Sequence, residues 1–299
     1  MNETLKRSIS GAVYIILLVA SILYSTESFF ILFGIFLLIA VVEFSSLTAI
    51  GKIIPVFSAV LLFSALSCLV LFKTDLKDDI HFTFSGKHYD INSVIDITTK
   101  ASLFISLLAA IKAIVFLFSH SITKLSHFSK YAFLFGYVIF PFVMITKIPF
   151  GEKGYNPKII ISIFILIWTN DTFAYVVGKS IGRHKLFERI SPKKTIEGFV
   201  GGVIFAIIAG FLISKYYFSP SPKHFDKSVL IWTITAFIVS FFGTIGDLIE
   251  SKFKRIAGVK DSGNIMPGHG GVLDRLDSII FAAPFVFLFY QILNYVTFS

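Results

Sequence analysis

The chain has 299 residues, of which 55% are hydrophobic and only 15% are charged, and its mean hydropathy is +0.82. This composition excludes an ordinary soluble domain and predicts a polytopic membrane protein. The formal charge of +9 suits an anionic membrane surface or an anionic substrate. The single cysteine excludes an internal disulfide.

Apolar runs of about 20 residues predict an all-α integral membrane protein, because a backbone that faces lipid must satisfy its own hydrogen bonds. We expect about nine transmembrane helices, at residues 8–25, 29–50, 53–72, 99–119, 131–148, 157–178, 197–218, 228–246 and 276–297. The first run is followed by further apolar runs, so we expect a membrane helix there and no cleaved signal. Residues 1–150 form an N-terminal region of about five spans, and residues 151–299 form a catalytic region of about four.

The distribution of lysine and arginine predicts that the N-terminus is cytosolic. In that orientation the cytosolic segments hold 16 of these residues and the opposite side holds 10, as the positive-inside rule favours. The loops that follow the sixth and eighth spans then lie on the same cytosolic side. On the opposite side, loop 73–98 contains Phe82-Thr83-Phe84, Gly86 and Tyr89, which predict a short hairpin.

Two carboxylates interrupt apolar spans. Glu43 lies near the cytosolic end of the second span, where either a role in a site or snorkelling to the interface is open to it. Asp171 lies within Trp168-Thr169-Asn170-Asp171-Thr172 of the sixth span, which Ala174-Tyr175 follows. A carboxylate at that depth must find a partner or a water-filled cavity.

The cytosolic loop after the sixth span is strongly basic. It ends in Ser191-Pro192-Lys193-Lys194-Thr195, just before the next helix. Two ammonium groups beside a helix N-terminus suit the binding of a triphosphate. The alternative is a basic loop that only anchors the cytosolic side. The seventh span begins with Gly198, Gly201 and Gly202, which we expect to allow close helix packing.

The last polar stretch is 246–277, between two long apolar runs. Its charged residues are the acids Asp247, Glu250, Asp261, Asp274 and Asp277 and the cations Lys252, Lys254, Arg255, Lys260 and Arg275. Mg²⁺ is usually held by one or two carboxylates together with substrate phosphates. The cations would neutralise the remaining phosphate charge. The alternative is a charged loop between two membrane helices.

The spacing of these acids suggests how they meet. Asp247 and Glu250 stand at i, i+3 where the eighth span ends, and Asp274 and Asp277 repeat that spacing where the ninth begins. Each pair can share one helix face. Between them, the segment 267–271 (Pro-Gly-His-Gly-Gly) is expected to expose backbone N–H groups as an anion-binding concavity. The start of the last helix adds its positive dipole end.

Two segments of this stretch read Ser251-x-Phe253-Lys254-Arg255-x4-Lys260-Asp261-x-Gly263 and Pro267-x-His269-Gly270-Gly271-Val272-x-Asp274-Arg275-Leu276-Asp277. Together they closely resemble the signature of the phosphatidate cytidylyltransferases, or CDP-diacylglycerol synthases. Met266 departs from the expected Leu, Ile or Phe by an apolar exchange. The DTxAY segment at Asp171 and the SPKKTxEG segment at Ser191 also look like parts of this family, so the resemblance covers at least residues 168–277.

The resemblance implies that CTP and phosphatidic acid react to CDP-diacylglycerol and pyrophosphate, a committed step of phospholipid synthesis. It implies Mg²⁺ as cofactor and leaves room for a second cation. The lipid phosphate is already anionic near neutral pH, so catalysis should rest on charge neutralisation and in-line positioning. The partners would be the two substrates and membrane lipid, with no nucleic acid. A homodimer is left open.

The resemblance also suggests roles for single residues. We expect Asp247 and Asp274 to be the main Mg²⁺ ligands, with Asp171, Glu250 and Asp277 as further candidates. The other catalytic candidates are Lys254, Arg255, Lys260, Asp261, His269 and Arg275, and the phosphate-binding candidates are Lys193, Lys194, Thr195, Ser251, Gly270 and Gly271. In a bacterium the protein would lie in the cytoplasmic membrane with its active site facing the cytosol.

Two rival functions are considered. A polyprenol or dolichol kinase would also use CTP, but it would transfer the γ-phosphate and release CDP. An ion-coupled transporter could use Glu43, Asp171 and Asp247 as relay groups. A transporter does not need dense cations and glycines in two loops on the same side. The CDP-alcohol phosphotransferase motif, DGx2ARx8Gx3Dx3D, is absent from the sequence.

Overall fold

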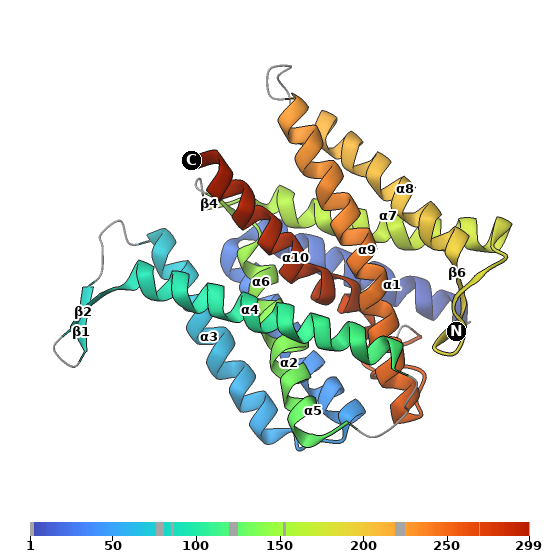
Figure 1. Cartoon of the computed structure of the whole chain (residues 1–299), viewed down its shortest axis with the longest axis horizontal. Helices are drawn as coiled ribbons and strands as arrows, with labels where there is room; N and C mark the ends of the chain where they lie inside the picture. The colour runs from blue at the N-terminus through green and yellow to red at the C-terminus, as the bar shows by residue number, and fades with distance from the viewer. Residues whose placement is uncertain are drawn as a thin grey trace.

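The computed structural model describes residues 3–75, 81–84, 87–119, 125–151, 154–218, 225–268 and 270–298, and it is dominated by helices (Figure 1). In chain order the elements are α1 (Glu3–Tyr24), α2 (Thr26–Thr48), α3 (Ile53–Asp75), β1 (His81–Phe84), β2 (Lys87–Asp90), α4 (Ile91–Phe118), α5 (His127–Phe133), η1 (Leu134–Ile139), α6 (Phe140–Lys147), β3 (Phe150–Gly151), β4 (Gly154–Tyr155), α7 (Pro157–Ile181), β5 (Lys185–Phe187), β6 (Ser191–Thr195), α8 (Ile196–Ile213), η2 (Ser214–Phe218), α9 (Phe225–Ala257) and α10 (Leu273–Phe298). The η elements are π-helical turns.

Seven helical segments in the described part of the chain are long and apolar enough to cross a membrane. They are Thr26–Thr48, Ser93–Phe118, His127–Lys147, Pro157–Ile181, Ile196–Phe218, Lys227–Ala257 and Leu273–Leu293. Two shorter apolar helices, Ile9–Tyr24 and Ile53–Ser67, coincide with the first and third predicted spans. The prediction of an all-α polytopic membrane protein is therefore confirmed, while the count of nine spans stays a prediction.

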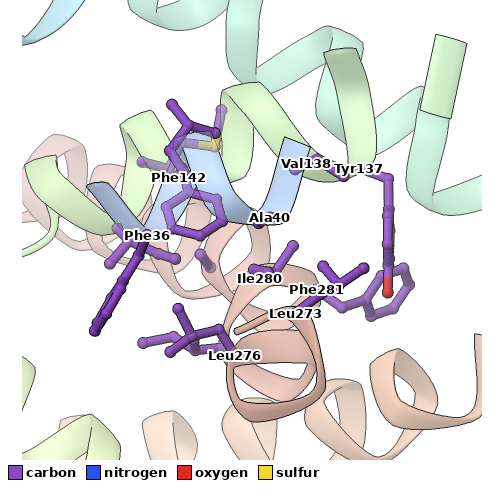
Figure 2. Close-up of a cluster of buried hydrophobic side chains, with 14 of the residues drawn as sticks. Phe36, Ala40, Tyr137, Val138, Phe142, Leu273, Leu276, Ile280 and Phe281 are labelled. Atoms are coloured by element: carbon purple, nitrogen blue, oxygen red, sulfur yellow. The ribbon is translucent and has the colours of Figure 1, made fainter. Parts of the chain in front are cut away.

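Side chains from both halves of the chain form one core. Figure 2 shows Phe36 and Ala40 of α2 and Tyr137 of η1 around the α10 residues Ile280 and Phe281. All five are buried, at no more than 6% exposure. The N-terminal helices therefore pack directly on the last helix. The division at residue 150 stays a prediction about function, because the apolar core runs across it.

The helix before the polar stretch is longer than predicted. We expected the eighth span to end near residue 246, but α9 continues to Ala257. Its added turns follow a helical pattern of buried apolar residues, with Leu248, Ile249 and Phe253 each at most 4% exposed. Asp247 and Glu250 consequently lie inside a helix.

Helix α9 ends in a Schellman motif. Gly258 has a φ of 70°, its N–H donates to Arg255 O at 3.2 Å, and the N–H of Val259 donates to Lys254 O at 3.0 Å. Glycine adopts this left-handed conformation without the penalty that a Cβ atom would bring. This turn directs the chain into the loop that carries the signature.

Other local predictions can be compared with the structure. Strands β1 and β2 pair from His81–Asp90 to Phe84–Lys87, which confirms the hairpin expected within 73–98. A Cβ at Gly198 or Gly202 would overlap α7, at Ala174 O and at the Asn170 side chain respectively. The expected close packing at these glycines is therefore confirmed between α7 and α8.

The end of α2 supports a prediction about stability. Ala49 closes this helix with a φ of 52°, and the N–H of Ile50 donates to Ser45 O at 3.0 Å. A residue with a Cβ costs roughly 1 kcal/mol in the left-handed conformation. Glycine removes this cost, but it also makes the unfolded chain more flexible, and this offsets part of the gain. Ala49→Gly should therefore stabilise the protein by about 0.5 kcal/mol.

The measurement is the thermal unfolding midpoint of the purified protein in detergent. Ala40→Gly is the control, because Ala40 lies in the interior of the same helix. There the exchange should lower stability by at least about 1 kcal/mol, because glycine weakens the helix and a buried methyl group is lost. A lower midpoint for Ala49→Gly would show that the left-handed turn carries no strain.

Candidate functional site

Three carboxylates from two helices converge at one point. Asp247 and Glu250 of α9 and Asp277 of α10 offer oxygen atoms that all lie within 4.8 Å of one another. We call these residues the carboxylate cluster. The predicted i, i+3 spacing does bring Asp247 and Glu250 to one helix face. The two residues lie in the middle turns of α9, however, and not at its end as expected.

The carboxylate cluster has the chemistry of a cation site. Glu250 is completely buried, and neither of its carboxylate oxygens accepts a well-directed hydrogen bond in the described part of the chain. Its ion-pair partner there is Lys254, one turn later in α9. Buried carboxylates this close together repel one another unless a cation compensates them. An all-oxygen donor set suits Mg²⁺.

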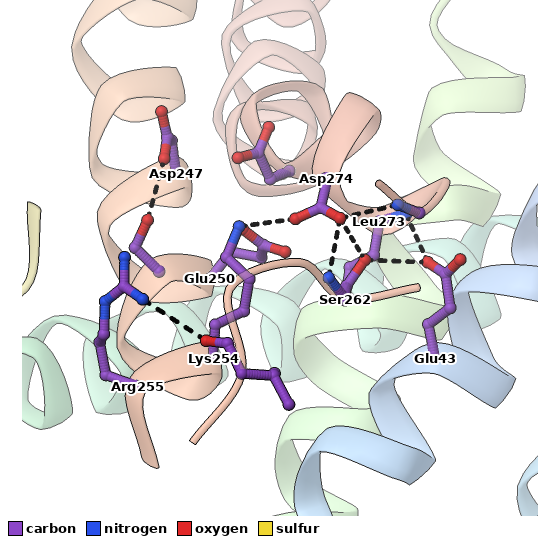
Figure 3. Close-up of polar contacts among 12 residues, drawn as sticks. Glu43, Asp247, Glu250, Lys254, Arg255, Ser262, Leu273 and Asp274 are labelled. Atoms are coloured by element: carbon purple, nitrogen blue, oxygen red, sulfur yellow. Dashed lines mark hydrogen bonds and ion pairs between the residues drawn. The ribbon is translucent and has the colours of Figure 1, made fainter. Parts of the chain in front are cut away.

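Asp274 lies beside this cluster and makes different contacts. Its Oδ1 forms an ion pair with Lys254 at 2.6 Å. Its Oδ2 accepts hydrogen bonds from Ser262 N, Ser262 Oγ and Gly271 N, each at 2.8 Å, as Figure 3 shows in part. The carboxylate grouped with Asp247 is therefore Asp277 and not Asp274. Asp274 instead holds the loop between α9 and α10, residues 258–272, against the start of α10.

Glu43 fixes the same loop from the N-terminal half. Its Oε1 accepts from Val272 N at 3.1 Å, and its Oε2 accepts from Leu273 N at 2.8 Å and from Ser262 Oγ at 3.2 Å. The side chain is 5% exposed, so it faces the bundle interior and does not snorkel. A carboxylate that receives the first N–H groups of α10 acts as its N-terminal cap.

Two signature glycines are explained by Glu43. A Cβ at Gly263 or at Gly271 would overlap the Glu43 carboxylate. The N–H groups of residues 271–273 are already taken by Asp274 and Glu43. Of the segment 267–271 that was expected to bind an anion, Gly271 therefore already donates its N–H to a carboxylate of the protein, and anion binding by the other positions stays a prediction.

The basic loop reaches the carboxylate cluster through Lys194. Strands β5 and β6 form a hairpin with Lys185 opposite Thr195, and Lys194 Nζ lies 2.5 Å from Asp247 Oδ2. The other Asp247 oxygen accepts from Ser251 Oγ at 3.3 Å. The two loops that sequence assigned to one membrane side do meet here. Thr195 caps α8, because its Oγ1 accepts from Gly198 N at 3.1 Å.

Lys252 has a structural position. It is 3% exposed, and its Nζ donates to the carbonyl oxygens of Phe116 and of Ser119, the latter at 2.9 Å. This lysine adds a hydrogen-bond donor to carbonyl oxygens at the C-terminal end of α4, where the helix dipole favours a cation. Lys252 therefore joins α4 to α9, and the expectation that it neutralises phosphate stays a prediction.

The remaining predicted residues lie around the carboxylate cluster. Arg255 donates through Nε to Ile190 O at 3.3 Å, which supports the β5–β6 hairpin. Asp171 accepts from Asn170 Nδ2 at 3.2 Å and lies within electrostatic range of Asp247 and Lys194. Exposed positions are held by Lys193, Lys260, Asp261 and Arg275, and Gly270 turns with a φ of 84° against Asp274. His269 lies outside the described residues.

Sequence reasoning missed Ser262. This residue is 8% exposed and donates its N–H to Asp274, and its single hydroxyl proton is shared between Asp274 Oδ2 at 2.8 Å and Glu43 Oε2 at 3.2 Å. It joins the two carboxylates that hold the loop. Its place directly after Asp261 in the signature was the available signal, but its partner Glu43 is 219 residues away in sequence.

Comparison with known proteins identifies the family. A family model described as "Cytidylyltransferase family" matches residues 5–293, so the chain belongs to that family, as its signature predicted. Relatives include proteins named phosphatidate cytidylyltransferase from Staphylococcus saprophyticus (47% identical over 123 residues), Staphylococcus aureus strain COL (50% over 121) and Bacillus subtilis strain 168 (47% over 123). The matched segments cover 40%, 40% and 41% of this chain and span 44% of the length of each of these relatives.

The Glu43 contacts lead to a prediction about stability. Glu43→Ala should lower the free energy of unfolding by about 3 kcal/mol, because hydrogen bonds to a buried charged group are lost and their donors are left unpaired. The measurement is thermal unfolding in detergent. Glu27→Ala is the matched control, because Glu27 is an exposed glutamate in the first turn of the same helix. Equal midpoints for the two variants would contradict a capping role for Glu43.

Proposed function

We propose that this protein is a Mg²⁺-dependent phosphatidate cytidylyltransferase. The observation that carries the proposal is the carboxylate cluster of Asp247, Glu250 and Asp277, which has Lys194 and Lys254 beside it. Membership of the cytidylyltransferase family and the names of the relatives support the same reaction.

The donor set favours a revised ligand assignment. We assign Asp247, Glu250 and Asp277 to the first cation, because their oxygens converge and Glu250 lacks a well-directed hydrogen bond. Asp274, with its Oδ2 shared by three donors, becomes a positioning residue. Asp171 stays a candidate for a second cation. When bound, Mg²⁺ would polarise the α-phosphate and stabilise the leaving pyrophosphate.

The residues of this chain supply binding and positioning. In the reaction, an oxygen of the lipid phosphate forms a bond to the α-phosphorus of CTP, while the bond to the bridging oxygen of pyrophosphate breaks. No strong base is required, because the attacking oxygen is already anionic. Lys193 and Lys194 stand directly before the N-terminus of α8, where ammonium groups and the helix dipole favour a triphosphate. A preorganised loop keeps these charges fixed during the reaction.

The proposal includes an orientation in the membrane. The carboxylate cluster and the basic β5–β6 hairpin belong to one end of the bundle, and the lysine and arginine bias assigns that end to the cytosol. CTP would enter from the cytosol, and phosphatidic acid would enter sideways from the bilayer. The N-terminus would be cytosolic, with nine spans in all. In a bacterium this would be the cytoplasmic membrane.

The first prediction concerns turnover. With CTP, phosphatidic acid and Mg²⁺, the purified protein should form CDP-diacylglycerol and pyrophosphate, identified by mass. Asp277→Asn should lower the rate at least about 100-fold, equivalent to roughly 3 kcal/mol of the barrier. Glu188→Gln, at an exposed acid of the β5–β6 turn, is the control and should keep full activity. Release of CDP with a phosphorylated lipid would move the assignment to a lipid kinase, and no turnover with any lipid would reject an enzyme of this class.

The second prediction concerns the cation alone. Mn²⁺ serves as a spectroscopic substitute for Mg²⁺, and its binding is followed by electron paramagnetic resonance without substrates. Asp277→Asn should weaken binding at least tenfold, because a direct ligand is removed. Asp274→Asn should change the affinity less and instead lower the thermal unfolding midpoint, since Asp274 holds the loop. The reverse pattern would restore Asp274 as the direct ligand.

A further inference from the structure

A cavity of about 440 Å³ lies at the end of the bundle away from the carboxylate cluster. It is bounded by the C-terminal ends of α6, η2 and α10 and by the N-terminal ends of α7 and α9. In Figure 1 the C-terminus of α10 and strand β4 lie near one another at the upper left, beside this region. The volume falls in the range of small-molecule sites, about 300–1,000 Å³.

Helix α9 gives the distance between the cavity and the carboxylate cluster. Ser228 lines the cavity, and Asp247 of the carboxylate cluster lies 19 residues further along the same helix. At a rise of 1.5 Å per residue this separation is about 28 Å, close to the roughly 30 Å thickness of a bilayer's hydrocarbon core. The cavity and the carboxylate cluster therefore lie about one hydrocarbon thickness apart along α9.

Lys147 gives the cavity a buried positive charge. Lys147 is among the lining residues, it is 8% exposed, and its Nζ donates to Thr99 Oγ1 at 2.5 Å. Among the described residues no carboxylate forms an ion pair with it, and no acidic residue lines the cavity. An ammonium group has three N–H donors, and the end of α6 offers only a partial negative charge. A buried cation without a counter-ion is costly, so an anion would be stabilised beside it.

The rest of the lining indicates an amphiphile. Lys227 adds a second, exposed ammonium group, and Asn156 and Gln291 add side-chain amides. The remaining wall is largely aromatic and aliphatic, with Trp232 and Phe287 among its members. Free phosphate would leave this apolar wall unused, whereas a lipid fills it with acyl chain.

We propose that this cavity binds the head group and upper acyl chains of an anionic phospholipid from the leaflet opposite to the carboxylate cluster. Lys147 binds the lipid phosphate, Lys227 lies at the mouth, and the aromatic wall holds the chains. This inference does not depend on the proposed reaction, and its test measures binding without turnover.

The test is native mass spectrometry of the full-length protein, delipidated in detergent and titrated with phosphatidylglycerol or phosphatidylcholine. Phosphatidylglycerol should bind more tightly than phosphatidylcholine. Lys227→Gln should weaken the binding of phosphatidylglycerol about fivefold, which is the effect of one lysine near an anionic head group. Lys158→Gln is the matched control: Lys158 lies in the first turn of α7 over the Tyr217 ring, does not line the cavity, and should leave binding unchanged.

Lys147→Met provides a second measurement, in which the variant is expected to be more stable than the wild type. Without lipid it should raise the thermal unfolding midpoint, because an uncompensated buried charge is removed. Phosphatidylglycerol should then stabilise the wild type and leave the variant unchanged. Three outcomes would overturn the proposal: equal binding of the two lipids, equal losses in Lys227→Gln and Lys158→Gln, or displacement of the lipid by equimolar inorganic phosphate.

Discussion

The whole site depends on how carboxylates are compensated inside a membrane bundle. Glu43 and Asp274 accept hydrogen bonds from backbone N–H groups and Ser262, so their charges are stabilised by the loop they hold. In the carboxylate cluster, Asp247 accepts from Lys194 and Ser251 and Asp277 accepts from Ser278 N, whereas neither Glu250 oxygen accepts a well-directed hydrogen bond in the described part of the chain. Lys254 connects the two groups, because it pairs with both Glu250 and Asp274. One group of acids thus builds the loop and leaves the other available for a cation.

This division makes the N-terminal half part of the site. Glu43 comes from α2, and Lys252 ties α9 to the end of α4. Figure 2 shows that α2 also packs against α10 through apolar side chains. The position of the carboxylate cluster is therefore set by helices that carry no recognisable motif. Such rigid support is what electrostatic catalysis requires, since fixed charges need no reorganisation during the reaction.

The sequence was sufficient for features that depend on short-range patterns. Apolar runs located the helices, i, i+3 spacing grouped Asp247 with Glu250, and the glycines of α8 indicated close packing. It was insufficient where partners lie far apart in the chain. Glu43 meets Leu273 across 230 residues, and Lys252 meets Ser119 across 133. The i, i+3 spacing also could not separate Asp274 from Asp277, because Asp274 is distinguished only by its contacts with Lys254, Ser262 and Gly271 in the folded loop.

The close fit of Gly263 and Gly271 against Glu43 has an evolutionary consequence. A methyl group at either glycine would overlap the Glu43 carboxylate, although neither glycine touches the carboxylate cluster as a ligand. Gly263 and Glu43 therefore form one unit of selection. A lineage that replaced Glu43 by a smaller residue would free the space for alanine at Gly263, whereas a Cβ at Gly271 would still overlap the Ser262 hydroxyl. Alanine at Gly263 should accordingly occur only together with a smaller residue at position 43 among related sequences.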